Sequence, residues 1–272
     1  MKEVILNNGT KIPSIGVGVF RVEDANIAYE TVKTALSVGY RHVDTAMIYG
    51  NEEAVGKAIR DSGIPREEIF LTTKLWNDDQ RSGKVEEAIE ASLKRLGMDY
   101  VNLYLVHWPV KETYVSVWKK MEAVYKSGKA KAIGVSNYQT HHLADLLEEA
   151  EIIPAVNQIE CYPYLSQAAT IQYCLERNIR PEAWGPLGAG KSDILTNPVI
   201  TEIAKKRGLT PAQVVLGWNL ERGVIVIPKS IHKERLTENL KCTDFELTDE
   251  DMTRISALNK NLRLGADPDH FN

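Results

Sequence analysis

The chain has 272 residues, of which 43% are hydrophobic and 26% are charged, a balance typical of a soluble globular protein with an ample core. Its net charge of -4 offers no basic surface for nucleic acid, and no stretch approaches the ~18 consecutive apolar residues of a membrane span. The three cysteines lack CxxC spacing and the N-terminal region has no signal-peptide pattern, so we expect free thiols and a cytoplasmic protein.

The first predicted element is a β-hairpin, in which Asn8-Gly9 supplies the turn between the apolar residues 4–6 and the segment 11–13. From residue 14 onward, β-rich runs alternate with amphipathic helical ones. We expect strands at 15–19, 42–44, 69–73, 101–106, 132–135, 155–159, 181–184 and 224–227. We expect helices at 26–37, 85–96, 114–126, 142–150, 168–177 and 211–221.

Eight strands that alternate with helices predict an α/β fold, a (β/α)8 TIM barrel with an N-terminal β-hairpin. An open doubly wound sheet is the alternative, but the unbroken composition favours a closed barrel and a single domain over residues 1–272. The short C-terminal tail from Asn261 is polar and is expected to lie over the surface.

Ionisable side chains follow several of the predicted strands. Asp44 ends one strand and Tyr49 stands on the loop after it, while Lys74 and His107 follow the next two strands. Each residue alone has an ordinary structural explanation, such as a loop cap or a solvated charge. Because active sites of such barrels form at the carboxyl ends of the strands, their convergence predicts a catalytic site.

The chemistry of these four side chains is coherent. A tyrosine with an ordinary pKa of about 10 is a poor acid, and an ammonium group close by would lower that pKa by roughly one to three units. Asp44 would fix Lys74 and keep it charged, and a neutral His107 could orient a substrate oxygen. The set suits a reaction in which a carbonyl oxygen gains a proton.

Six motifs resemble those of the aldo-keto reductase family: GYRHVDTAMIYGNE (39–52), LTTKLW (71–76), VHWP (106–109), GVSNY (134–138), NQIE (157–160) and IPKS (227–230). They occur in the family's order across the whole chain. The resemblance implies an NADPH-dependent, monomeric barrel that reduces a small carbonyl substrate. It implies a catalytic tetrad in which Tyr49 is the general acid, completed by Asp44, Lys74 and His107.

The same resemblance implies a cofactor site. The nicotinamide carboxamide would be held by Ser136, Asn137 and Gln158, and the ring would stack on Trp184. The loop over the pyrophosphate would include Gly185, Leu187 and Gly188. The 2′-phosphate would be bound by Lys229, Ser230 and Arg235, with Glu238 and Asn239 near the adenine.

Aromatic and apolar residues beside the predicted tetrad are expected to line the substrate pocket, namely Phe20, Ile48, Trp76 and Trp108. No metal site is expected. Gly185 stands where many relatives have serine, and the run that it opens resembles the bacterial diketogluconate reductase and methylglyoxal reductase-like branch. Small aldehydes, dicarbonyls and keto-sugars such as diketogluconate all remain possible substrates. Gly217 stands where relatives often carry arginine, and the sequence offers no functional account of it.

Two other functions are compatible with parts of the sequence. Residues 185–192 satisfy the P-loop pattern GxxxxGK[ST], but that site needs a helix that opens on Lys191-Ser192, and Pro198 is expected to leave room for only a short one. A catalytically silent NADPH-binding sensor or structural barrel is the other alternative. The intact tetrad argues against it.

Overall fold

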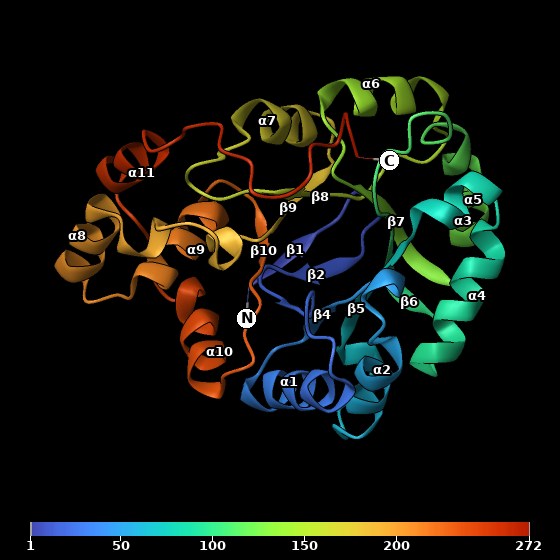
Figure 1. The fold of residues 1–272 in the computed structure, drawn as a ribbon, viewed down its shortest axis with the longest axis horizontal. Helices are drawn as coiled ribbons and strands as arrows, with labels where there is room; N and C mark the ends of the chain where they lie inside the picture. The colour runs from blue at the N-terminus through green and yellow to red at the C-terminus, as the bar shows by residue number, and fades with distance from the viewer. Residues whose placement is uncertain (1, 272) are drawn as a thin grey trace.

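Eight parallel strands form a barrel surrounded by helices in the computed structural model, which describes residues 2–271 (Figure 1). Their order is β3 (Val17–Gly18), β4 (His42–Asp44), β5 (Phe70–Leu75), β6 (Val101–Val106), β7 (Ala130–Ser136), β8 (Val156–Glu160), β9 (Arg180–Trp184) and β10 (Ile225–Ile227). A parallel bridge between Ile15 and Val226 joins the two ends of the sheet. The predicted (β/α)8 barrel is confirmed. Met1 and Asn272, the ends of the predicted domain, lie outside the described residues.

The predicted hairpin closes the amino-terminal end of the barrel. Strands β1 (Glu3–Ile5) and β2 (Lys11–Pro13) pair antiparallel, and Gly9 takes a left-handed φ of 84° in the turn between them. Leu6 and Ile12 are buried in one cluster with Phe70 at the start of β5 and with other residues of the barrel interior. Because this end is sealed, access to the interior is confined to the carboxyl ends of the strands.

The helices lie outside the barrel (Figure 1). They are α1 (Ala25–Val38), α2 (Glu52–Arg60), α3 (Asn77–Ser82), α4 (Val85–Leu96), α5 (Ser116–Lys126), α6 (Thr140–Glu149), α7 (Ala168–Glu176), α8 (Pro198–Arg207), α9 (Pro211–Glu221), α10 (Lys233–Leu240) and α11 (Asp249–Ser256). Among residues 2–271, no helix has the length and apolar character needed to cross a membrane.

Helix α8 begins at Pro198, so a helix that opened on Lys191-Ser192 would have to end before this residue, as expected from the sequence. Pro198 is the first residue of a ten-residue helix, and the side chain of Asn197 accepts a hydrogen bond from the Val199 N–H. Proline is favoured at this position because its missing N–H would have no partner inside the helix. Pro198 therefore marks the start of α8.

The barrel interior is polar near the carboxyl ends of the strands. Successive strand residues point alternately inward and outward, and the inward-pointing residues there are polar. Leu71 and Leu75 of β5 pack in the cluster shared with the helices, whereas Lys74 points inward and contacts Asp44 of β4. From β8 and β9, Gln158 and Glu182 also point inward, since they hydrogen-bond to each other. These strands therefore deliver charged side chains to the open end of the barrel.

Gly217 has a packing explanation. It lies within α9, where an added Cβ would stand 2.8 Å from Cε2 of Phe245. A larger side chain at this position would displace the Phe245 ring. The glycine allows α9 to lie close to the segment after α10.

The C-terminal tail lies over the surface, as predicted, and its course crosses the carboxyl end of the barrel. Figure 1 shows this red segment running from α11 past α7 to a point beside α6. The backbone N–H groups of Leu264 and Gly265 donate to the buried carboxylate of Glu160, at 2.8 and 3.0 Å. At its far end, Phe271 packs on Trp108 with ring centroids 4.4 Å apart.

Candidate functional site

The four ionisable residues singled out in the sequence meet at the carboxyl end of the barrel. Lys74 Nζ lies 2.6 Å from Asp44 Oδ1, 2.9 Å from the Thr45 carbonyl oxygen and 3.4 Å from the Tyr49 hydroxyl. The rings of Tyr49 and His107 are 5.8 Å apart. Lys74 is fully buried and His107 is 7% exposed, so a substrate here would react away from bulk water.

Burial decides the protonation states at this site. It raises the pKa of Tyr49, and the charge of Lys74 opposes this shift without reversing it. The predicted lowering of the Tyr49 pKa is therefore wrong in its net direction, because the loss of hydration outweighs the ammonium group. Burial acts to lower the pKa of Lys74, but the charges of Asp44 and Tyr49 outweigh it and the net shift is upward.

His107 is the third titratable group of the pocket. Burial, assisted by the charge of Lys74, holds the pKa of His107 well below its usual 6.5. Its Nδ1 has no hydrogen-bond partner among the described residues. At neutral pH the site therefore contains a neutral phenol, an ammonium ion and a neutral imidazole.

Aromatic side chains surround this group. The rings of Phe20 and Tyr49 are 5.0 Å apart, and the Trp76 ring lies 5.2 Å from His107. Trp108 stacks against His107 at 6.4 Å, whereas Ile48 is 45% exposed at the rim. The four residues predicted to line the substrate pocket therefore stand around the opening of the barrel.

Phe271 belongs to the same wall and was missed in the sequence. Its ring lies 4.4 Å from Trp108 and 6.3 Å from Trp76. The only sequence signal for it is an aromatic residue near the end of a polar tail. Its placement depends on long-range contacts that hold the tail.

One such contact joins the tail to the start of α6. Asp269 lies 2.9 Å from His141 Nε2 and accepts a hydrogen bond from Gln139 Nε2. His141, His142 and Asp269 bring possible metal ligands within 4.8 Å of one another, a set that the sequence did not reveal. However, His142 Nδ1 accepts the Gln139 N–H, which puts the proton of a neutral ring on the Nε2 that faces Asp269. The geometry favours a hydrogen-bonded clasp over a metal site.

The predicted carboxamide-binding residues lie together at the ends of β7 and β8. Asn137, with a left-handed φ of 64°, donates to the His107 carbonyl and to Ser136 Oγ, and accepts from Trp184 Nε1 at 2.8 Å. Gln158 Nε2 donates to Asp44 Oδ2 at 2.8 Å. No described group donates to the Gln158 Oε1 atom, so that oxygen can accept from a ligand.

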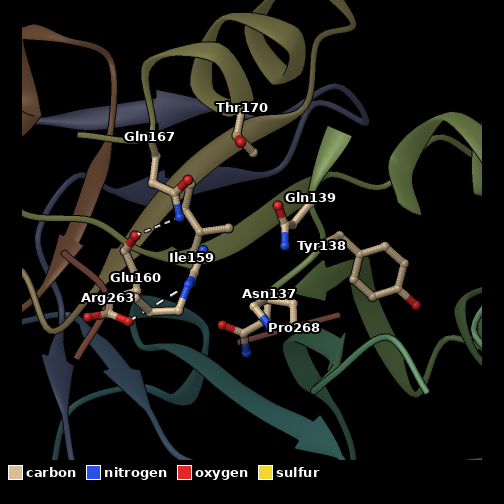
Figure 2. Close-up of a pocket in the computed structure, with 9 residues that line it drawn as sticks. All are labelled: Asn137, Tyr138, Gln139, Ile159, Glu160, Gln167, Thr170, Arg263 and Pro268. Carbon is tan, nitrogen blue, oxygen red and sulfur yellow. Dashed lines mark hydrogen bonds and ion pairs between the residues drawn. The ribbon is translucent and has the colours of Figure 1, made fainter. Parts of the chain in front are cut away.

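A small, shallow pocket lies beside this group (Figure 2). Asn137 lies on one side of it, and Glu160 and Arg263 lie on another, with Pro268 of the tail also at its edge. This space is next to the predicted nicotinamide site and is bordered by the tail. It is separate from the wall that Phe20 and Tyr49 form.

The loop after β9 does not have P-loop geometry. Gly185 and Gly188 have left-handed φ values of 59° and 74°, and Leu187 packs partly buried against the core. The residues Lys191 and Ser192 fall between the short 3-10 turns Gly188–Gly190 and Ile194–Thr196, so no helix opens on them. The structure removes the basis for the nucleotide triphosphatase alternative.

The residues predicted to bind the adenosine end follow β10. Lys229 and Arg235 are exposed, and Ser230 is buried with its hydroxyl oxygen accepting from the His232 N–H at 3.2 Å. On α10, the Glu238 carboxylate accepts from Thr210 Oγ1 at 2.7 Å, and Asn239 is buried. The two exposed cations can therefore meet a phosphate, whereas Glu238 is already engaged by α9.

Comparisons with known proteins agree with this architecture. The model of the aldo/keto reductase family matches residues 14–260. The chain is 51% identical to a glyoxal reductase of Bacillus subtilis over 98% of this chain and 96% of the relative, and 42% identical to the methylglyoxal reductase DkgA of Escherichia coli over 98% and 96%. The crystal structure of MGS-M4, an aldo-keto reductase from a Medee basin deep-sea metagenome library, superposes with a TM-score of 0.96 at 48% identity, with both chains covered completely. The chain therefore belongs to the aldo/keto reductase family, whose members are oxidoreductases that reduce carbonyl groups with a nicotinamide cofactor.

Proposed function

We propose that this protein is an NADPH-dependent carbonyl reductase in which Tyr49 is the general acid. The observation that carries the proposal is the position of the Tyr49 hydroxyl, 3.4 Å from Lys74 Nζ, beside a neutral His107 and the exposed ring of Phe20. Tyr49 is partly buried and its pKa is raised, so its hydroxyl stays protonated at neutral pH and can donate that proton to a group bound in the pocket.

The residues present fit a nicotinamide dinucleotide with a 2′-phosphate. The free Oε1 of Gln158 suits an amide N–H of the carboxamide, and the partly exposed Trp184 ring offers a stacking surface. Lys229 and Arg235 supply two exposed cations for the phosphate, and arginine can bind it through two hydrogen bonds. When bound, the reduced nicotinamide supplies hydride to the carbonyl carbon.

The protein's own residues would then act on the carbonyl oxygen. The Tyr49 hydroxyl donates its proton to that oxygen as negative charge develops there. Lys74 stabilises the resulting phenolate, and Asp44 holds the ammonium group in place. A neutral His107 orients the substrate oxygen by hydrogen bonding, and the aromatic wall excludes water.

The substrate would be a small carbonyl compound. Phe271 packs against both Trp76 and Trp108 at the carboxyl end of the barrel, and this aromatic wall favours a small substrate. Relatives named glyoxal reductase and methylglyoxal reductase support dicarbonyls as the first class to test. Simple aldehydes and keto-sugars such as diketogluconate are the next classes.

The experiment is to follow oxidation of NADPH, and separately of NADH, with a panel of these carbonyl compounds. We expect turnover with at least one dicarbonyl and a preference for NADPH. Replacing Lys229 with Gly and Arg235 with His should weaken NADPH binding far more than NADH binding. An equal loss for both cofactors would contradict the phosphate assignment, and tight NADPH binding without turnover across the panel would support the silent sensor.

A further inference from the structure

A second buried carboxyl group lies beneath the Asp44–Lys74 pair. Glu182 of β9 is fully buried, and its position two residues before Trp184 directs it into the barrel. The amide nitrogen of Gln158 donates to both carboxyl groups, at 2.8 Å to Asp44 Oδ2 and 3.2 Å to Glu182 Oε2. Gln158 therefore links the two acids.

Asp44, Lys74, Gln158 and Glu182 form one buried polar cluster. Its charges do not balance if both Asp44 and Glu182 are ionised. Lys74 is its only ammonium group among the described residues, and it lies 2.6 Å from Asp44. His42 Nε2 lies 3.6 Å from Glu182 Oε1, but burial lowers the pKa of His42 to about 3, so the ring is neutral. An uncompensated buried carboxylate is strongly unfavourable.

Glu182 is therefore the acid that retains a proton. Its Oε1 has no hydrogen-bond partner among the described residues, in contrast to both Asp44 oxygens. Burial, followed by the negative charge of Asp44, raises the pKa of Glu182 to about 8. Asp44 and His42 on β4, Lys74 on β5 and Gln158 on β8 are the polar groups that face it.

We propose that Glu182 is a positioning residue of this active site: a neutral carboxylic acid that fixes the Gln158 amide and leaves Lys74 with Asp44 as its single carboxylate partner. The inference rests on the proposed function. Because the Gln158 nitrogen is held between two acids, its oxygen is directed to accept from the cofactor carboxamide. Ionisation of Glu182 would add a negative charge beside Lys74 and hold the Tyr49 proton more tightly.

The direct test needs neither cofactor nor substrate. Infrared difference spectra of the wild type and Glu182→Gln, recorded over a pH series, should show the carbonyl stretch of a buried protonated carboxylic acid in the wild type alone. We expect this band to disappear as the pH rises through about 8. Its absence from the wild type at mildly acidic pH, or its persistence in Glu182→Gln, would overturn the proposal.

A second test separates positioning from simple packing. Glu182→Leu removes the acceptor for Gln158, so NADPH affinity, followed by tryptophan fluorescence, should fall by about fivefold or more. Glu182→Gln keeps an acceptor of the same shape and should restore most of that affinity. In the same variant, the pH at which kcat for reduction declines on the alkaline side should differ from that of the wild type. If Gln and Leu weaken NADPH equally, the neutral-acid role is wrong. Failure of the proposed function would instead appear as absent turnover in the wild type with the infrared result unchanged.

Discussion

Replacing Lys74 with Met tests whether the Asp44–Lys74 pair holds the site together. The pair is joined at 2.6 Å, and its two side chains are 0% and 3% exposed. Without the ammonium group, Asp44 keeps only the Gln158 hydrogen bond among the contacts described above. Stranding one charge of a buried pair costs about 3–5 kcal/mol, so we expect the free energy of unfolding to fall by that amount.

A double-mutant cycle isolates the interaction. Asp44→Asn removes the carboxylate, and the double variant Asp44→Asn/Lys74→Met has neither buried charge. We expect the double variant to be more stable than the sum of the single losses predicts, with a coupling energy of about 2–3 kcal/mol. Urea unfolding at neutral pH measures all four proteins.

The exposed pair Lys129–Glu90 provides a matched control, since its side chains are 34% and 60% exposed. Lys129→Met should change the free energy of unfolding by about 1 kcal/mol or less. Additive losses for Asp44→Asn and Lys74→Met would refute the argument, because they would show that the two charges do not depend on each other.

Three further predictions concern the tail, the buried acid and helix packing. Phe271→Ala should lower kcat/KM for a small carbonyl substrate by about tenfold with NADPH affinity retained, and an unchanged kcat/KM would place the ring outside the substrate pocket. Folded Glu182 keeps its proton between its ordinary pKa of 4.5 and about 8, so wild-type stability falls as pH rises through this window. In urea unfolding over this pH range, the free energy of unfolding of Glu182→Gln should rise relative to the wild type by up to about 1.4 kcal/mol per pH unit. A difference between the two proteins that does not change with pH would contradict this prediction. Gly56→Ala would put a Cβ 1.9 Å from the Leu96 carbonyl oxygen and should cost about 1–3 kcal/mol, measured by calorimetry; an unchanged Tm would contradict it.

The barrel could be predicted because each unit carries its own local signals. Residues 85–96 have an apolar stripe at helical spacing, and the structure has α4 with these bounds. The bounds of β4 and β6 were also predicted correctly. Helix α8 was not among the predicted helices, although the missing N–H of Pro198 suits the first helical position.

Within the site, residues carried by the strand ends were found and residues placed by tertiary contacts were not. Asp44 and Lys74 follow directly from strand register, whereas Phe271 depends on a tail held by Glu160 and by the clasp at Asp269. Glu182 could have been found, since a charged residue two positions before Trp184 points to the same side of β9.

The sign of the Tyr49 pKa shift illustrates a further limit of the sequence. The presence of Lys74 could be predicted, but the degree of burial could not. In the structure, burial contributes more than the ammonium group and the pKa of Tyr49 rises. Predictions from residue types alone therefore identified the partners without identifying which effect dominates.

The central claim is that Tyr49 supplies the proton, and Tyr49→Phe tests it most directly. The variant removes one hydroxyl group from a ring that also packs against Phe20 and His107, so folding and NADPH binding should be preserved. Reduction of the best dicarbonyl substrate at neutral pH, followed by NADPH oxidation, should fall by about 100-fold to 10,000-fold. A rate close to that of the wild type, with NADPH bound equally well, would contradict the account.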